Sequence, residues 1–419
     1  MKILIVTHRA LPHGDASSAV VENLAHALME QGCESKVLGL TGYPEDRNIL
    51  EWKGISVTNV YALIGRSKEQ ILCGLRLYAP LDLCALLLRS FSKAIEHAWP
   101  VYRKQTVIPL YLPVYRKAIQ REMQTGQYDL CLVTLAPYEA VFAVRQMPEM
   151  KGRFAVYQLD AYWNRADLPV EFKEERLTAE RQMIAESLFV LTTPQIIDSY
   201  RSKAPELVDK VIPAEFPMVK EQLWQERLPV RQNEKPHCAF LGTLYSGIRP
   251  PEKVVRLISE LSSDTIFDFY GSGQDLIEKS PDYSIAKERI CLHGPVSPDQ
   301  AAEARRCSDV LVNIDNTSVT QVPSKIFEYM STGKPILNFY FNSESPTLAY
   351  FSKYPLCCSV DLNADVTQAA HTVDAFLKDA FGRQIPFAEI KQIFLKNTPA
   401  YVADQCLAAY EKAVKNRMN

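Results

Sequence analysis

The chain has 419 residues, more than one ordinary domain needs, so two domains are expected. With 47% hydrophobic and 23% charged residues, it has the composition of a globular protein and not of a disordered or collagen-like one. A formal charge of −2 argues against a general nucleic-acid-binding surface, because such surfaces carry an excess of positive charge.

Short apolar runs alternate with helical patterns in the first half of the chain. The apolar runs are residues 3–6, 36–38, 130–133, 154–157 and 189–191. Buried parallel strands have this continuous apolar character. Between the first two runs lie a polar loop containing Gly14 and a helical pattern over 20–28 that ends at Gly32.

A second alternating series begins near Cys238. Its expected strands are 238–241, 266–270, 290–292, 310–314 and 336–339, separated by helical patterns at 252–261, 299–306 and 325–331. Two successive series of this kind predict an α/β protein with two doubly wound parallel sheets, each covered by helices on both faces. We place the N-terminal domain at 1–213 and the C-terminal domain at 214–402, with the hinge in the proline-containing stretch 211–217.

The stretch 65–122 interrupts the alternation with long apolar clusters and an excess of basic residues. These include Arg76, Arg89, Lys93, Arg103, Lys104, Arg116, Lys117 and Arg121. A basic helical insertion of this kind can lie on an anionic membrane or receive an acidic or lipid-linked substrate. The alternative is a set of packing helices whose basic side chains extend to water.

Residues 322–336 form the most specific segment of the sequence. Pro323 and Ser324 indicate the start of a helix, and Gly333 its end. Free backbone N–H groups at a helix start bind phosphate, and Lys325 adds a positive charge there. Glu328, one turn further on, can accept hydrogen bonds from ribose hydroxyls. The pattern alone is equally typical of a helix with Lys and Glu facing water.

The run Pro-Ser-Lys-Ile-Phe-Glu-Tyr-Met-x-x-Gly-Lys-Pro resembles the donor-binding signature of GT-B glycosyltransferases. The similarity is greatest to the family 4-like retaining enzymes, also called glycosyl transferases group 1. It implies two Rossmann-like domains facing a cleft, and a helix over 403–419 that packs back on the N-terminal domain. In this family the glutamate at the position of Glu328 contacts the nucleotide ribose.

Further segments resemble the family in its order and spacing, most specifically between about 240 and 335. The residues implied for donor binding are Gly14, Asp15, Gly242, Thr243, Arg249, Lys253, Gly271, Gly273, Gly294, Pro295, Val296, Asn316, Pro323, Ser324, Lys325 and Glu328. The chain also departs from the family pattern. Thr320 stands where many members have a sugar-contacting glutamate, which transfers that role to Asp315, Asn316, Thr317 or nearby backbone. Thr243 replaces a frequent arginine, and 134–139 contains no counterpart of a histidine often found near the reacting centre.

The implied reaction transfers a sugar from a nucleoside-diphosphate sugar to a glycan, lipid-linked or small-molecule acceptor. The main catalytic contribution is positive charge beside the departing diphosphate, supplied by Arg249, Lys253, Lys325 and helix N–H groups. In a retaining front-face mechanism the leaving phosphate accepts the acceptor proton. If a protein base is needed, Asp160 is the first candidate and Glu139 the second.

The sequence leaves other functions open. An inverting transferase, a GT-B nucleotide-sugar epimerase and a non-catalytic sugar-nucleotide-binding scaffold are the alternatives. We expect no metal and no cofactor, since there is no Asp-x-Asp and the seven histidines lack metal-ligand spacing. The expected pathway is cell-surface polysaccharide or glycoconjugate synthesis.

The location expected from sequence is the cytoplasm, with peripheral contact to the inner face of the membrane through 65–122. The first apolar run is too short for a signal peptide and is interrupted by His8. No run reaches the about 18 apolar residues of a membrane-spanning helix. Ten cysteines without a C-x-x-C pair predict reduced, structural thiols.

Overall fold

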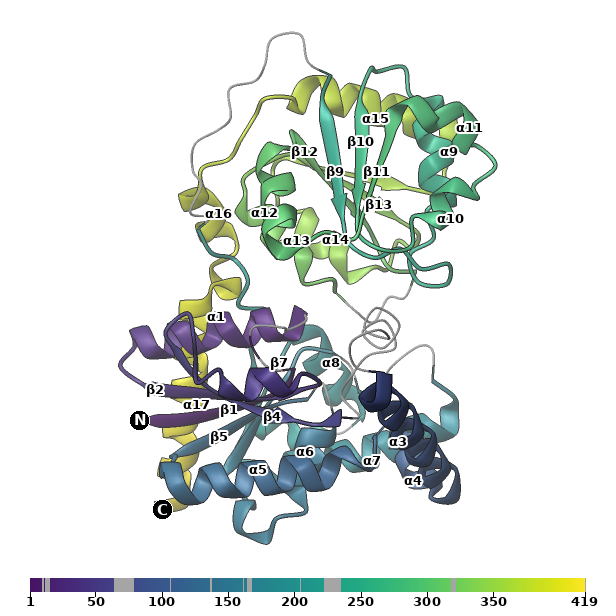
Figure 1. The fold of residues 1–419 in the computed structure, drawn as a ribbon. Helices are drawn as coiled ribbons and strands as arrows, with labels where there is room; N and C mark the ends of the chain where they lie inside the picture. The colour runs from purple at the N-terminus through teal and green to yellow at the C-terminus, as the bar shows by residue number, and fades with distance from the viewer. Residues whose placement is uncertain are drawn as a thin grey trace. The chain divides into compact units, whose positions relative to one another are not determined.

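The computed structural model describes residues 1–9, 11, 16–63, 79–105, 107–135, 138–160, 162–163, 168–203, 205–221, 235–317 and 322–418. The chain forms two compact units (Figure 1). Unit 1 comprises Met1–Met218 together with Lys396–Asn419, and unit 2 comprises Val219–Leu395.

Unit 1 is built on an eight-stranded sheet in the order β3-β4-β2-β1-β5-β6-β7-β8. The strands are β1 (Lys2–Arg9), β2 (Glu34–Thr41), β3 (Glu51–Trp52), β4 (Ile55–Tyr61), β5 (Leu130–Thr134), β6 (Phe154–Gln158), β7 (Val190–Thr192) and β8 (Val211–Pro213). All neighbours pair in parallel except β3, which pairs antiparallel with β4. The central strands β1, β5 and β6 are buried, which explains why their sequences are apolar without alternation.

Helices cover both faces of this sheet. They are α1 (Ala16–Glu30), α5 (Tyr111–Gly126), α6 (Tyr138–Arg145), α7 (Val170–Glu186), α8 (Pro194–Lys203) and α17 (Pro399–Met418). The helix α17 packs against α1, where Gln31 Nε2 donates to Asp404 Oδ1 over 2.8 Å. On the opposite face, α5 and α6 pack against each other and against β1. The chain therefore returns to unit 1 for its last helix.

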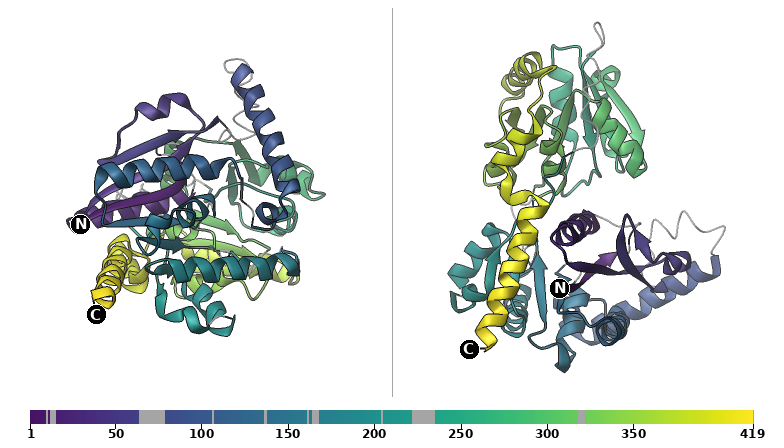
Figure 2. Two further views of the ribbon diagram at one scale, coloured as in Figure 1. Left: turned by 90° about the horizontal axis from the view of Figure 1, so that it is seen from below. Right: turned by 90° about the vertical axis from the view of Figure 1, so that its left-hand side faces the viewer.

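Two complete helices of unit 1 belong to the described part of the basic insertion. They are α3 (Ala79–Ala98) and α4 (Pro100–Gln105), and the described part of the insertion ends in α5. Ala85 and Ser92 of α3 are buried, which shows that one stripe of the helix packs inward. Figure 2 shows α3 extending beyond the rest of unit 1.

Unit 2 has a six-stranded parallel sheet in the order β11-β10-β9-β12-β13-β14. Its strands are β9 (His237–Leu241), β10 (Ile266–Tyr270), β11 (Ile290–Gly294), β12 (Val310–Ile314), β13 (Ile336–Tyr340) and β14 (Cys357–Asp361). The helices are α9 (Glu252–Glu260), α10 (Asp275–Glu278), α11 (Tyr283–Ala286), α12 (Pro298–Cys307), α13 (Lys325–Ser331), α14 (Pro346–Phe351), α15 (Val366–Ala380) and α16 (Phe387–Ile393). The prediction of an α/β protein with two doubly wound parallel sheets is thus confirmed.

Candidate functional site

The strand order of unit 2 locates a crevice before any side chain is considered. From β9 the chain moves outward to β10 and β11, and then returns to the other side of β9 to form β12. In open parallel sheets, the loops that leave two such strands separate at their carboxyl ends and create a ligand-binding crevice. The loop after β9 carries Arg249, and the loop after β12 carries Asn316.

Glycines at the strand ends allow three backbone segments to approach each other there. Gly271 follows β10 with φ +121°, and a Cβ on it would lie 2.1 Å from the carbonyl oxygen of Gly242. Similarly, Gly273 has φ +85°, and its Cβ would lie 2.3 Å from the oxygen of Leu244. No side chain fits at those distances. Positions 271 and 273, in the turn after β10, must therefore be glycine for that turn to pack against the turn after β9.

Two cations meet beside Gly242. A Cβ on Gly242 would lie 3.3 Å from Lys325 Nζ and 3.8 Å from Arg249 Nη1. Both cationic side chains therefore occupy the space next to the glycine turn, although they come from different loops. They are two of the three cations that the sequence predicts for the leaving diphosphate; the third is Lys253.

Arg249 is held in place by two hydrogen bonds that leave part of its guanidinium available. Its Nη1 donates to the carbonyl oxygen of Thr243 (3.0 Å) and its Nη2 to Asn316 Oδ1 (2.8 Å). The buried Nε has no hydrogen-bond partner among the described residues. Burial lowers the pKa of Arg249 below its ordinary value. A guanidinium with donors left over and no carboxylate bonded to it is suited to receive an anion.

Lys325 lies in an environment that disfavours its charge. Its Nζ sits 4.1 Å from the ring centre of Phe240 and 5.7 Å from that of Tyr329, and lies 3.5 Å from the carbonyl oxygen of Leu241. Burial, and then repulsion from Arg249, hold the pKa of Lys325 well below its ordinary value. Binding of an anion beside both cations would reverse this effect.

Asp315 and Asn316, in the loop after β12, form one side of this crevice. Asp315 is 1% exposed; its oxygens accept hydrogen bonds from the hydroxyls of Ser345 and Thr347, at the start of α14. Burial raises the pKa of Asp315, and these hydrogen bonds act against that rise. Asp315 thus ties the loop after β12 to α14, while Asn316 holds Arg249.

The helix α13 begins and ends at the residues that the motif predicts. The N–H groups of Ile326 and Phe327 donate to the carbonyl oxygens of Pro323 and Ser324, which closes the first turn. Glu328 is partly exposed, and its Oε2 lies 3.2 Å from Nη1 of Arg305 in the last turn of α12. The carboxylate of Glu328 is therefore fixed by a cation from the neighbouring helix.

The remaining donor-site candidates that the structure describes come from other segments of unit 2. Lys253, in the first turn of α9, is exposed and donates from Nζ to Asn363 Oδ1 over 2.6 Å. Gly294 is the last residue of β11 and is followed by Pro295 and Val296; its N–H donates to Gln274 Oε1 (3.0 Å). Gly14, Asp15 and Thr320 lie outside the described residues.

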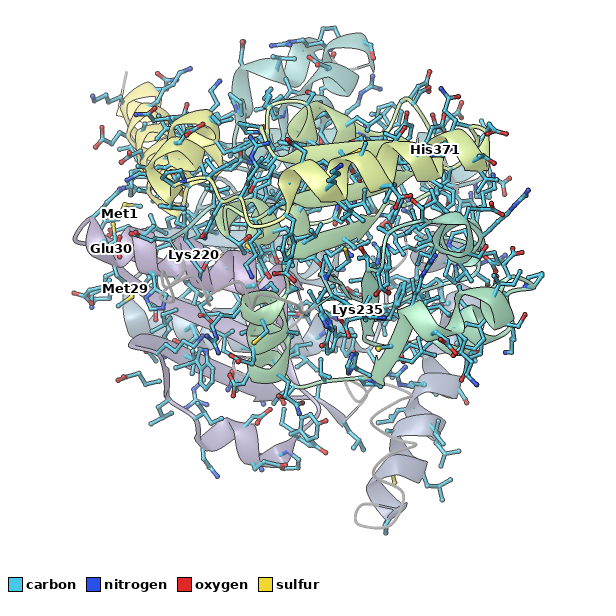
Figure 3. All side chains as sticks on the ribbon, turned by 90° about the horizontal axis from the view of Figure 1, so that it is seen from above. Met1, Met29, Glu30, Lys220, Lys235 and His371 are labelled. Carbon is cyan, nitrogen blue, oxygen red and sulfur yellow. The ribbon has the colours of Figure 1, made fainter. Side chains whose placement is uncertain are left out.

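Two histidines flank a carboxylate beside the turn at Gly294. Asp268 of β10 accepts from His237 Nδ1 (2.6 Å) and from His293 Nε2 (2.7 Å). The ring of His293 stacks on Tyr270, with centroids 4.1 Å apart and planes 8° apart. These contacts orient the end of β11. In contrast, His371 is an exposed residue of α15 (Figure 3).

In unit 1, the two candidate bases come after neighbouring strands. Asp160 follows β6, and Glu139 lies in the first turn of α6 after β5. Glu139 is 3% exposed and accepts the N–H of Ile108 over 2.8 Å, and burial raises its pKa to about 7. Gln158 Nε2 lies 3.3 Å from the carbonyl oxygen of Asp160.

A buried acid that sequence analysis missed lies close to Asp160. Glu180 of α7 is 1% exposed, and its Oε1 accepts from Gln158 Nε2 (2.6 Å) and from the hydroxyl of Tyr200 (2.5 Å). Its Oε2 has no hydrogen-bond partner within the described ranges. Burial raises the pKa of Glu180 to about 7. Its helix is rich in charged residues, so the sequence contains no signal of this burial.

Tyr329 is a second residue that sequence analysis missed. Its hydroxyl donates to the carbonyl oxygen of Leu241 (3.2 Å) and accepts from the Leu241 N–H (3.1 Å). It lies one helical turn after Lys325, and this spacing, which places the two side chains on the same face, was a signal that could have found it.

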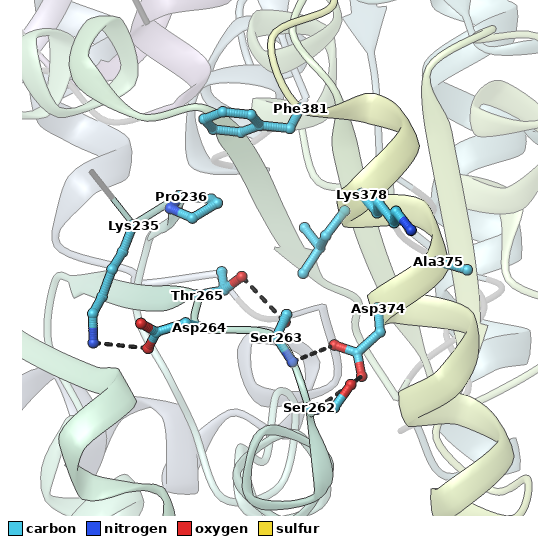
Figure 4. A pocket seen from close by; sticks show the side chains of 11 residues that line it. Lys235, Pro236, Ser262, Ser263, Asp264, Thr265, Asp374, Ala375, Lys378 and Phe381 are labelled. Atoms are coloured by element: carbon cyan, nitrogen blue, oxygen red, sulfur yellow. Dashed lines mark hydrogen bonds and ion pairs between the residues drawn. The ribbon is translucent and has the colours of Figure 1, made fainter. Parts of the chain in front are cut away.

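A pocket of about 720 Å³ lies at the opposite edge of the same sheet (Figure 4). It is lined by residues just before β9 and β10 and by α15. Lys235 pairs with Asp264 over 2.7 Å, and Asp374 accepts from the N–H groups of Ser262 and Ser263. These contacts tie the segments before β9 and β10 to each other and to α15.

No protein-family model matches the chain, and no curated protein sequence matches it either. Solved structures, however, are similar along almost its whole length. Sucrose-phosphate synthase from Thermosynechococcus elongatus has a TM-score of 0.65 at 14% identity, with 99% of this chain and 100% of that chain covered. The Anabaena protein HepE in complex with UDP and glucose has a TM-score of 0.55 at 11% identity, with 100% and 99% covered. UDP-GlcNAc 2-epimerase from Methanocaldococcus jannaschii has a TM-score of 0.57 at 10% identity, with 97% and 99% covered.

These similarities establish the fold. The chain has the GT-B fold, with two Rossmann-like parallel-sheet units, as its donor-binding signature implied. Glycosyltransferases and nucleotide-sugar epimerases both occur among the similar structures.

Proposed function

We propose that the chain is a metal-independent glycosyltransferase that moves a sugar from a nucleoside-diphosphate sugar to a hydroxyl acceptor. The observation that carries the proposal is the meeting of Arg249 and Lys325 beside Gly242, at the strand-order reversal of unit 2. Among the described residues, no carboxylate is bonded to either cation, and such a pair matches a diphosphate, whose charge increases as the sugar leaves.

In the proposed reaction, the bond between the sugar C1 and the diphosphate oxygen breaks, and its electron pair remains on the diphosphate. The acceptor oxygen forms the new bond to C1 on the same face, and its proton passes to the leaving phosphate. Arg249 and Lys325 stabilise the negative charge that develops, and Glu328 binds the ribose. Unit 1 holds the acceptor, and Asp160 is the first candidate if a protein base takes the proton.

The proposed acceptors are glycans, lipid-linked sugars or small molecules of cell-surface polysaccharide synthesis. Two alternatives make different predictions. An epimerase consumes a nucleotide sugar without any acceptor, a possibility favoured by the epimerases of the same fold. A non-catalytic scaffold would bind the nucleotide sugar without converting it to any product.

The test incubates the purified chain with UDP-, GDP- and dTDP-sugars, with and without acceptors, and measures the nucleoside diphosphate released. We expect acceptor-dependent release from one base class that persists in a metal chelator and is lost in Arg249→Gln. Epimer formation without acceptor supports the epimerase. Donor binding without turnover across the panel contradicts the proposal and supports the scaffold.

A further inference from the structure

The exposed apolar side chains of the described residues concentrate on one short region. Of thirteen large hydrophobic residues that are exposed, six lie between positions 83 and 101. They are Leu83, Leu86, Leu87, Phe91, Trp99 and Val101. All six belong to α3, to α4 or to the residue between them. Scattered exposed apolar residues need no explanation, but a cluster of this kind indicates an interaction surface.

The packing of unit 1 does not use this apolar face. The inward stripe of α3 contains Ala85 and Ser92, which are buried, and Leu88, which packs against the unit 1 core. Leu83, Leu87 and Phe91 are spaced by four residues and form a row on the other side, about 60% exposed at each position. The helix is therefore apolar on a face that unit 1 leaves open, and Figure 2 shows that α3 extends beyond the unit.

Positive charge accompanies the apolar row. Between residues 79 and 105, the span of α3 and α4, the chain has four basic residues against two acidic ones, although the whole chain carries a net charge of −2. One of the four, Lys104, is paired with Glu175 of α7 over 3.0 Å. On α3, Arg89 and Lys93 lie between the inward stripe and the outward row, and Arg103 follows on α4 as an exposed residue. Basic side chains beside an inserted apolar row are placed to contact phosphate groups.

We propose that the face formed by α3 and α4 docks on an anionic lipid bilayer. The apolar row enters the boundary between headgroups and acyl chains, while the basic residues contact the lipid phosphates. The helices lie along the surface; among the residues that the structure describes, no helix is long and apolar enough to cross a membrane. The charge excess selects an anionic bilayer over a second copy of this chain, whose matching face would be equally positive. This proposal does not depend on the proposed transferase activity.

The experiment is co-sedimentation of the full chain with vesicles of phosphatidylglycerol and phosphatidylcholine, compared with phosphatidylcholine alone. We expect at least tenfold tighter binding to the anionic vesicles. The variant Leu83→Gln/Leu87→Gln/Phe91→Gln should lose at least tenfold of that binding. The matched control Leu50→Gln/Val170→Gln/Ile285→Gln removes three apolar side chains elsewhere that are somewhat more exposed, and it should bind as the original chain does.

Charge is tested separately. Lys93→Gln and Arg103→Gln should each weaken anionic binding about fivefold, as expected for one charge at such a surface. The control pair Lys287→Gln and Lys391→Gln lies on unit 2 and should have no effect. Trp99 supplies a direct signal, because its emission should shift to the blue on binding and the shift should be lost in Trp99→Phe. Circular dichroism establishes that each variant is folded.

Equal binding to neutral and anionic vesicles would overturn the proposal, as would unchanged binding of the folded triple variant. If that variant instead changes a dimer into a monomer without affecting vesicle binding, a second copy covers the face and the proposal is wrong. Binding of UDP, measured on the same samples, reports independently on the proposed donor site.

Discussion

At the strand ends of unit 2, the loops after β9 and β12 bring two cations together, whereas in unit 1 buried acids lie beside the ends of β5 and β6. Lys325 has a lowered pKa beside Arg249, and Glu180 and Glu139 have pKa values raised to about 7. In all three groups, burial is the main reason why the charged form is disfavoured. Similar sheet topologies therefore place two cations at the strand ends of one unit and two protonatable acids at those of the other.

The largest effect on this difference between the units is expected from removing a cation of unit 2. Lys325→Met should lower kcat/KM for sugar transfer by about 10²–10³-fold, because the leaving diphosphate loses a preorganised charge. It should also raise the stability of the free protein by about 1 kcal/mol, since a desolvated charge is replaced by an apolar chain of similar length. Steady-state kinetics and thermal unfolding measure both effects.

The control for this prediction is Lys287→Met, which removes an exposed charge of the same unit. Full activity in Lys325→Met would contradict the cationic role. The direction of the pH dependence also follows. The pKa of Lys325 is lowered in the free protein, so its ammonium loses its charge as the pH rises through that pKa, and the affinity for a nucleoside diphosphate should fall.

The variant Glu180→Gln tests the buried acid beside the end of β6 in unit 1. The pKa of Glu180 is raised from 4.5 to about 7, so the original chain should lose stability as the pH rises from about 4.5 to 7. Glutamine keeps an oxygen that accepts from Gln158 and Tyr200 and removes the charge. We expect the variant to be more stable than the original at pH 8 by roughly 2–3 kcal/mol, and equal at pH 4. Denaturant unfolding across this range measures the difference, and parallel curves would contradict it.

A smaller effect is expected at Glu328. Replacing it by alanine should weaken nucleotide binding about 10- to 100-fold, the value of a hydrogen bond between a charged group and the ribose hydroxyls. Isothermal titration with nucleoside diphosphates measures it. Because Arg305 pairs with Glu328, the variant Arg305→Gln serves as a control for the position of the carboxylate. Unchanged affinity in Glu328→Ala would remove the ribose assignment.

The smallest effect is expected at Lys253. Its ammonium is exposed and bonded to Asn363, in contrast to the enclosed ammonium of Lys325. We expect Lys253→Gln to change donor affinity less than about threefold, as for exposed charges generally. A loss comparable to that of Lys325→Met would show that Lys253 also belongs to the diphosphate site.

Sequence patterns predicted the interior of the fold better than its edges. The predicted segments 266–270, 310–314 and 325–331 coincide with β10, β12 and α13. Continuous apolar runs and the Pro-to-Gly boundaries of the motif are local signals, which explains their accuracy. The edge strand β14 and the strand β4 were not predicted, because both are partly exposed and contain no continuous apolar run.

The sequence by itself determined the two parallel sheets and the bounds of the helix at 325–331, since periodicity and turn residues act over a few neighbouring positions. Only the tertiary structure decided that Arg249 lies beside Lys325, because the order of strands brings their distant loops together. It also decided that Glu180, in a charged helix, is buried, and that the row from Leu83 to Phe91 faces outward. Burial and long-range proximity depend on how elements pack, and no local pattern of residues contains that information.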